Sequence, residues 1–241
     1  MQGDCLCIVL SVNLHLLNQM KKSLVALAVF GAFAASTAHA DTAVSLSAGT
    51  TGMGIHLTAK FTDNVNFRFG LNGYNHDTTE STDDANYNLD VKLQTVDALV
   101  DYHPFGGGFR LTGGVMYNGN KLDARATPTG AGTYTFNGQT YTAADAGDVT
   151  GKIDFNKIAP YVGIGFGNAV AKNKGWGFTA DLGVMFMGSA KINLASNNCT
   201  ATSTVCDQLT NDLQAESAEL RDDAKDFRYY PVARVGVAYR F

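Results

Sequence analysis

The sequence predicts an all-β protein, an eight-stranded antiparallel transmembrane β-barrel with short periplasmic turns and longer extracellular loops. Three observations predict this fold. After residue 40, apolar and polar side chains alternate with a period of two, as in strands that face lipid on one side and a lumen on the other. Short turns and longer polar loops follow one another between these segments. The last segment ends in an aromatic-x-aromatic sequence, Tyr239-Arg240-Phe241.

Residues 20–40 have the composition of a cleaved export signal. Lys21-Lys22 supplies a positive start, residues 23–35 are apolar, and Ala38-His39-Ala40 is a small-x-small cleavage site. The apolar run is shorter than the roughly 20 residues that a membrane-spanning helix needs. We therefore expect this segment to be removed on export and not to anchor the protein.

This signal divides the chain into three parts. Residues 1–19 precede a signal that already starts with its own methionine, so they are interpreted as an upstream start-site extension. Residues 20–40 are the signal, and the mature protein is expected to begin at Asp41. Residues 41–241 are long enough for one domain, the outer-membrane β-barrel.

The composition excludes two classes of protein. No apolar run after residue 40 is long enough to cross a bilayer as a helix, although 45% of the residues are hydrophobic, so an α-helical membrane protein is excluded. The formal net charge of −4 argues against a nucleic-acid partner, which requires a basic surface.

Eight alternating segments are separated by turn residues. They are residues 43–49, 52–61, 64–76, 86–103, 109–128, 152–170, 176–195 and 228–241. Every second connection is short, at residues 62–64, 104–108 and 171–175, and an even strand number places both termini on that periplasmic side. One alternative stays open, because residues 43–61 could form a single bent strand and leave seven strands.

Extending the alternation along each segment assigns a set of charged side chains to the lumen, with His56 and His103 nearby. The set is Lys60, Arg68, Asp97, Asp101, Arg110, Asp181, Arg234 and Arg240. These charges could form a salt-bridged plug or line a narrow channel for small solutes or ions. The plug is favoured because the interior of an eight-stranded barrel is only wide enough to be filled by side chains.

Aromatic residues gather at the periplasmic strand ends, as an interfacial girdle requires: Phe61, Tyr102, Phe109, Trp176 and Tyr239.

One long loop contains a strong hairpin signal, Asn137-Gly138 between two short alternating runs. The turn should set Tyr134 opposite Tyr141 and leave Phe136 near the tip. An outward-facing aromatic patch of this kind could bind a host or envelope ligand. Cross-strand stacking that stabilises the hairpin is the alternative.

The last long loop contains Cys199 and Cys206, which we expect to form a disulfide because export places them in an oxidising compartment. Apolar residues then recur at helical spacing: Leu209, Leu213, Leu220, Ala224 and Phe227. The sequence predicts a short amphipathic helix, which lies over the barrel mouth or packs on neighbouring loops.

No motif indicates catalysis, a cofactor or a bound metal. A G-x-S-x-G element is absent, and the nearest approach to a nucleophile beside a base is His76 with Thr78, Thr79 or Ser81. Residues 76–90 are acidic but lack the spacing of a calcium loop, so a solvated loop is expected there.

The chain resembles the small eight-stranded outer-membrane barrels, the OmpA-transmembrane, OmpX and OmpW-like superfamily. The resemblance rests on Ala38-His39-Ala40, Asp63-Asn64, residues 104–118 and 159–167, and the terminal Tyr239-Arg240-Phe241. It implies insertion into a Gram-negative outer membrane by the assembly machinery, which reads Tyr239 and Phe241 as part of its signal. It does not imply an activity, because the superfamily hosts several.

From these features we expect a monomer in contact with outer-membrane lipid and lipopolysaccharide. Its function is expected to be non-enzymatic, in envelope integrity or in surface recognition through the extracellular loops.

We expect export to remove everything up to Ala40, and the folded product to resist SDS at room temperature but unfold on boiling. The reason is that a closed barrel has no free strand edge at which unfolding can start. Intact mass and a heat-shift gel test both points. A mature mass that includes residues 20–40, or a mobility unaffected by heating, would contradict the prediction.

Overall fold

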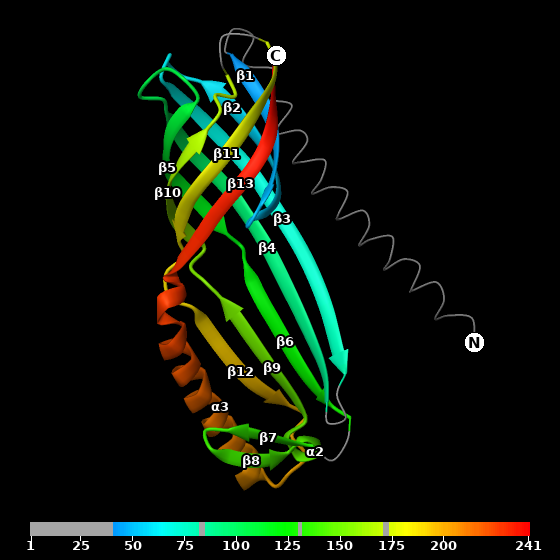
Figure 1. The fold of residues 1–241 in the computed structure, drawn as a ribbon. Helices are drawn as coiled ribbons and strands as arrows, with labels where there is room; N and C mark the ends of the chain where they lie inside the picture. Colours follow the sequence, from blue (N-terminus) through cyan, green and yellow to red (C-terminus); the bar gives the residue numbers. More distant parts are fainter. Residues whose placement is uncertain (1–40, 82–84, 130–131, 171–173) are drawn as a thin grey trace, which may run out of the picture. The chain divides into compact units, whose positions relative to one another are not determined.

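The computed structural model describes residues 41–81, 85–129, 132–170 and 174–241. The predicted extension and signal, residues 1–40, lie outside the described residues. Eight antiparallel strands close into a ring in which each pairs with the next and the last pairs with the first (Figure 1). In ring order they are β1 (Thr42–Gly49), β2 (Gly52–Lys60), β3 (Val65–Ser81), β4 (Ala85–Tyr102), β5 (Phe109–Asn118), β10 (Ile158–Phe166), β11 (Gly175–Phe186) and β13 (Tyr229–Arg240). The predicted fold class is confirmed.

The short connections lie at one end of the ring, here called the turn end. They join β2 to β3 and β4 to β5, and the connection between β10 and β11 reaches into residues outside the described ranges. The first strand begins and the last strand ends at this same end, as Figure 1 shows for the C-terminus. The opposite end is called the loop end.

At the loop end, β1 and β2 are joined by a tight turn. Gly49 pairs with Gly52 across it, and Gly52 has a φ of 92°, a conformation that glycine adopts without steric cost. The alternative of a single bent strand over residues 43–61 is therefore wrong.

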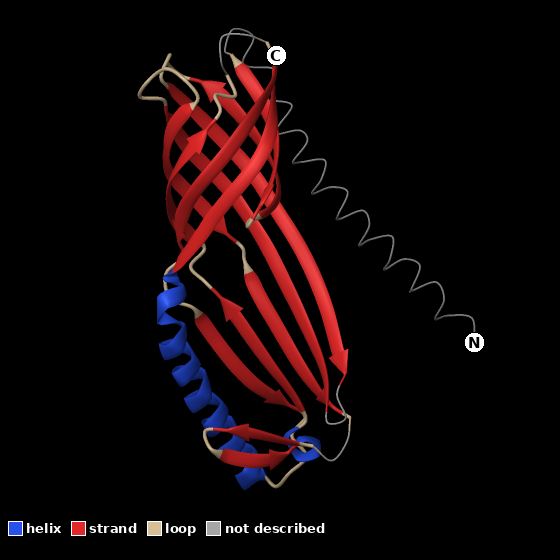
Figure 2. Ribbon diagram, viewed as in Figure 1, coloured by secondary structure: helices blue, strands red, loops and turns tan. Residues whose placement is uncertain are grey.

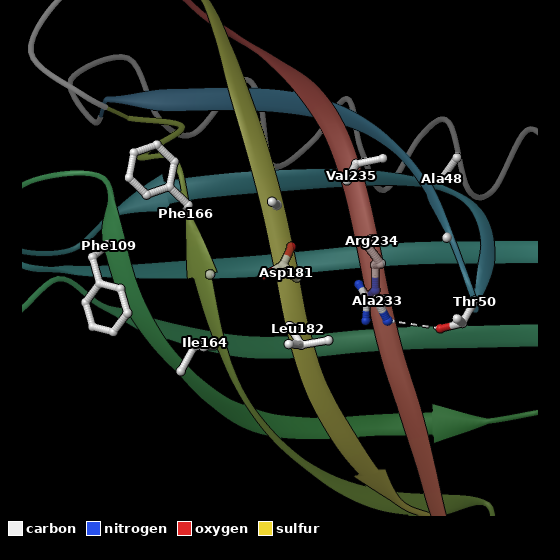
Figure 3. Close-up of a pocket in the computed structure, with 13 residues that line it drawn as sticks. Ala48, Thr50, Phe109, Ile164, Phe166, Asp181, Leu182, Ala233, Arg234 and Val235 are labelled. Carbon is white, nitrogen blue, oxygen red and sulfur yellow. Dashed lines mark hydrogen bonds between the residues drawn. The ribbon is translucent and has the colours of Figure 1, made fainter.

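Along the ring strands the alternation predicted from the sequence is present. In β3, Phe67 and Phe69 are exposed on the outside while Arg68 between them is buried. The outer surface is apolar, and Figure 3 shows side chains from β5, β10 and β11, among them Phe109, Ile164 and Leu182, around a hollow of about 770 Å³ on it. The alternation of side chains along a strand is enough to place the apolar side chains outside and the charged side chains inside.

Beyond the loop end, β3 and β4 continue and are joined by three further strands of the same sheet, in the order β3-β4-β6-β9-β12. The added strands are β6 (Lys121–Pro128), β9 (Asp148–Asp154) and β12 (Lys191–Asn197). The predicted strands 109–128, 152–170 and 176–195 are therefore each two strands. They break where they leave the ring and change neighbours, since β4 pairs with β5 in the ring but with β6 beyond it. Most of the acidic segment 76–90 is strand, so its prediction as a loop is wrong.

The polarity of the strands inverts at this boundary. Within the ring, Thr95 and Asp97 of β4 face inward and Val96 faces outward. Further out on the same strand, Val91 continues the inward side and Lys92 the outward side. A ring surrounded by hydrocarbon and an extension surrounded by water require opposite patterns, because the outside of each must match its solvent.

The apolar inner face of the extension is covered by α3 (Ser203–Asp223) and by the hairpin of β7 (Thr133–Phe136) and β8 (Gln139–Thr142) (Figure 2). Helix α3 lies along β12, where the Ser217 hydroxyl accepts from the backbone N–H of Leu194 at 3.0 Å. The two short helices are α2 (Ala143–Ala146) and η1 (Ala224–Arg228). Together with the outer halves of β3 and β4, these elements form what we call the loop-end domain. Among the described residues, no helix has the length and hydropathy needed to cross a bilayer.

The predicted amphipathic helix is present and packs on neighbouring elements. Leu209 and Leu213 are 1% exposed and form a small core with Tyr141, Ala146 and Val149. Leu220 and Phe227 are exposed. The helix therefore stabilises the loop-end domain by burying its apolar face against β12 and the hairpin.

Cys199 and Cys206 form the predicted disulfide, with their Cα atoms 6.0 Å apart. The bridge joins the segment after β12 to the first turn of α3, where the Cys206 N–H donates to Thr202 O at 3.0 Å. It thereby fixes where the helix begins.

We expect Cys199→Ser to destabilise the loop-end domain by about 2 to 3 kcal/mol, because a short disulfide loop removes that much chain entropy from the unfolded state. The ring should be unaffected, since the bridge lies outside it. Limited proteolysis should show faster cleavage in residues 198–228, while the heat-shift gel remains that of the wild type. Free thiols at both positions in protein isolated from an oxidising envelope would contradict the pairing.

Candidate functional site

The middle of the lumen contains a four-membered ion cluster from four strands. Arg68 of β3 donates through Nη1 and Nη2 to Asp181 of β11 at 2.9 and 3.0 Å, and its Nε lies 3.0 Å from Asp101 of β4. Arg110 of β5 contacts the same Asp181 carboxylate at 2.8 Å. All four residues are at most 8% exposed. Two arginines face two aspartates, so the buried group is electrically neutral.

A second ion pair lies beside it. Asp97 of β4 accepts from Arg234 Nη1 at 2.6 Å and from Asn72 Nδ2 at 3.1 Å, and both charged residues are at most 3% exposed. Arg234 belongs to β13 and so brings the last strand into contact with the opposite side of the lumen. Neutral donors complete the network, since Thr112 donates to Asp101 at 2.6 Å.

Glycines on the inward face make room for these long side chains. A Cβ atom at Gly165 would lie 2.7 Å from Arg110 Nε, and one at Gly70 would lie 2.1 Å from the His56 ring. Each glycine is the register partner of that side chain, so the side chains lie flat over the neighbouring strand, which lets an eight-stranded interior hold several arginines.

An apolar layer adjoins the ions in the lumen. Met116, Tyr161, Met185 and Val232 are at most 1% exposed and form one cluster with Leu99. Met116 is the register partner of Asp97, and Tyr161 pairs with Met185, so this layer lies directly beside the ions. The sequence did not predict this layer because only charged residues were assigned to the lumen. The alternation along β11 places Met185 on the inward side, and this is the signal that could have revealed the layer.

Two residues predicted for the lumenal network lie at its turn end. Lys60 pairs with Asp63 at 2.8 Å and its side chain is 27% exposed, so it lies at the edge of the lumen and not among the buried charges. Arg240 is buried at the end of β13, six residues beyond Arg234.

The histidines occupy structural positions. The His56 Nε2 atom lies 2.9 Å from Arg234 Nη1, which only donates, and 3.2 Å from Asp97 Oδ2, which only accepts, so these contacts are compatible with either tautomer. Nδ1 lies 3.5 Å from Ser47 Oγ, too far for a strong hydrogen bond. The imidazole is therefore held mainly by the Arg234 and Asp97 ion pair. His76 Nε2 lies 2.9 Å from Thr78 Oγ1 on the exposed part of β3.

The hairpin contains the predicted turn. Asn137 and Gly138 have φ values of 49° and 74°, and Tyr134 pairs with Tyr141. The aromatic side chains pack against α3, and Tyr141 is 8% exposed. The prediction of an outward-facing aromatic patch is therefore wrong, because burying these rings against Leu209 and Leu213 removes more apolar surface from water.

Polar contacts from α3 fix the hairpin tip. Asp212 accepts from Asn137 Nδ2 at 3.0 Å and from the Tyr141 hydroxyl, and Glu216 accepts from the Asn137 N–H at 3.0 Å. The hydrogen bonds from Asn137 and then Tyr141 hold the pKa of Asp212 below its usual range.

The pKa of Tyr141 is raised to about 12, first by burial and then by Asp212. The contribution of Asp212 is present above its unfolded pKa of about 3.9 and is lost as pH falls through the lower folded value. That of Tyr141 is present below about pH 10 and is lost as pH rises through about 12. Both contacts therefore hold throughout the neutral range.

We expect Asp181→Ala to lower the stability of the ring by about 3 to 5 kcal/mol, because it leaves Arg68 and Arg110 without their shared carboxylate in a buried site. The matched control is Asp63→Ala, which removes an exposed partner of Lys60 and should cost about 0 to 1 kcal/mol. Urea unfolding midpoints in detergent measure both. Equal midpoints for the two variants would contradict a stabilising role for the cluster.

No protein-family model and no curated protein sequence matches this chain. Several solved structures do, and two of them follow. CarO2 of Acinetobacter baumannii is 22% identical, with 84% of this chain and 98% of that chain covered and a TM-score of 0.54. CarO of the same organism is 24% identical, with coverages of 83% and 97% and a TM-score of 0.54. This likeness shows the fold, and the chain has the architecture of the small eight-stranded outer-membrane β-barrels.

Proposed function

We propose that this protein is a non-enzymatic barrel of a Gram-negative outer membrane, with its lumen closed by a charge plug. It acts in envelope integrity or surface recognition through the loop-end domain. The turn end faces the periplasm and the loop end faces the exterior. Its partners are outer-membrane lipid and lipopolysaccharide, and the assembly machinery, which recognises Tyr239 and Phe241. It functions as a monomer.

Residence in a membrane is supported by the outer surface of the ring. The large outward side chains are apolar, and aromatic rings gather at the turn end, where Trp176 is 78% exposed and contacts Tyr239 edge to face. Aromatic rings favour the interface between lipid and water. The inversion of strand polarity beyond the ring then indicates the level at which the protein leaves the hydrocarbon.

Closure of the lumen is supported by the two layers that fill it, and this is the observation on which the proposal chiefly rests. A conducting pore needs polar walls that water can reach. Here the arginines and aspartates are paired with one another, and an apolar layer that includes Met116 and Met185 fills the lumen beside them. Side chains that satisfy one another leave few groups to solvate an ion.

A surface role is supported by the size and order of the loop-end domain. A five-stranded sheet, the hairpin of β7 and β8, a 21-residue helix and a disulfide form a folded unit where a simple barrel has only loops. Its outward face is charged, with Lys92, Asp123 and Lys152 among the exposed or half-exposed groups. Ordered loops of this kind present residues for binding from a rigid scaffold.

In planar lipid bilayers we expect the wild-type protein to show no steady conductance, because the lumen is filled. Asp181→Ala should not raise it, since the apolar layer remains. Met185→Ala in the apolar layer is the matched variant, and combining the two changes should produce openings. Steady, selective conductance of the wild type, with selectivity altered by Asp181→Ala at unchanged stability, would establish the narrow channel in place of the plug.

A further inference from the structure

The sheet beyond the loop end has two outer edges, and only one of them is covered. At the β12 edge, α3 supplies partners for the backbone, since Ser217 Oγ accepts from the Leu194 N–H at 3.0 Å and Arg221 donates to a carbonyl of β12 at 2.9 Å. At the other edge, β2 pairs with β3 only as far as Gly73, and the rest of β3 pairs only with β4 among the described residues. Figure 1 shows β3 and α3 on opposite sides of this extension. Residues 75–81 therefore form an open edge, of the kind to which an extended chain adds a strand.

The register shows which backbone groups point out of this edge. The His103 N–H donates to Asn64 O at 2.7 Å on the β4 side, one residue before β3 begins, and the register with β4 is constant over Val65–Ser81. Because bonded residues alternate in an antiparallel ladder, even-numbered residues of β3 bond to β4 and odd-numbered residues face the other way. On that other side the Phe61 N–H donates to Val65 O, in agreement. The residues with an N–H and a C=O at the open edge are Asn75, Asp77, Thr79 and Ser81.

The inward face beside the open edge is also uncovered. Tyr74 pairs with Leu93, and alternation along β4 puts Tyr87 and Leu89 on the same inward face as Leu93. Tyr74, Tyr87 and Leu89 are 50%, 44% and 40% exposed, because α3 lies along β12 at the far side of the sheet. A strand added at the edge would continue this face, and its apolar side chains would remove these rings and the leucine from water.

The open edge is acidic. Residues 74–81 contain Asp77 and Glu80 but no lysine or arginine. The register neighbour of Asp77 is Asp90, which already contacts Lys92. Opposite charges that face each other on paired strands stabilise the pair, and like charges destabilise it. An added strand therefore needs basic side chains opposite Asp77 and Glu80.

We infer that the open edge of β3 binds an extended basic segment of a partner protein, which adds to the sheet as an antiparallel strand. Its backbone bonds to the four edge-facing residues, its apolar side chains cover Tyr74 and Leu89, and its lysines or arginines lie opposite Asp77 and Glu80. A second copy in the same membrane cannot supply an antiparallel β3, because β3 runs outward in every copy. The inference deepens the proposed surface-recognition role and rests on it for the extracellular position of the edge.

The test uses the mature protein in phosphatidylcholine nanodiscs and a fluorescein-labelled peptide, Thr-Lys-Thr-Val-Lys-Val-Thr, with binding measured by fluorescence polarisation. Aligned antiparallel to residues 75–81, the peptide has its lysines opposite Glu80 and Asp77, and its odd-numbered residues point their backbone groups at β3. N-methylation of its third residue should weaken binding at least about ten-fold, because it removes a hydrogen bond and puts a methyl group between the two backbones. N-methylation of its fourth residue, whose N–H points away from β3, is the matched control and should leave binding unchanged.

Two variants test the edge from the side of the protein. Thr79→Pro removes one edge-facing N–H and no bond to β4, so the protein should fold, as a heat-shift gel and limited proteolysis would show, and bind the peptide at least about ten-fold more weakly. Asp77→Lys should weaken the peptide by up to about five-fold. A peptide with glutamate at its fifth residue should show the opposite preference and bind this variant better than the wild type.

Three results would overturn the assignment. One is wild-type protein that does not bind the peptide, and another is an equal loss on N-methylation of the third and the fourth residue. The third is association of protein-bearing nanodiscs with one another that Thr79→Pro abolishes, which would assign the edge to a second copy in an apposed membrane. Labelling of Thr79→Cys on intact cells by a membrane-impermeant maleimide tests the extracellular position separately, because both faces of a nanodisc are accessible to the peptide.

Discussion

Pairing of β13 with β1 closes the ring, and the rest of the structure depends on this closure. Seven residue pairs, from Ala43 with Arg240 to Gly49 with Arg234, join the two ends of the chain. Each ring strand then has a neighbour on both sides, so no row of backbone N–H and C=O groups faces hydrocarbon. Closure at eight strands also sets an interior that side chains must fill.

Ion pairs and apolar side chains together fill that interior. Long arginines reach across the lumen over glycines and meet aspartates from distant strands, and their charges cancel within the cluster. Methionines, a tyrosine and a valine fill the space beside them. Buried ion pairs add little net stability compared with apolar packing, but each depends strongly on its partner. The cluster therefore constrains which strands face one another across the lumen.

Outside the ring the same strands are in contact with a different solvent. The loop-end domain is an amphipathic sheet with its apolar face inward, and α3 and the hairpin cover much of that face. Between this covered region and the apolar layer of the lumen a hollow of about 540 Å³ remains, and its walls are almost wholly apolar. This hollow results from joining two units whose outer surfaces differ, one apolar and suited to lipid and the other polar and suited to water.

The sequence by itself determined the strand alternation, the inward side of Arg68, Asp97 and Asp181, the Asn137-Gly138 turn and the cysteine pair. These features are local, because a period of two or a turn is set by neighbouring residues. Only the tertiary structure decided that Arg68 meets Asp101 and Asp181, which are 33 and 113 residues away. It also decided that three predicted strands break at the rim and that the aromatic hairpin is buried under α3. The physical reason is that alternation shows that a strand has two different faces, but not which solvent or which other strand each face contacts. When the apolar and polar faces exchange sides at the rim, the period of two does not change.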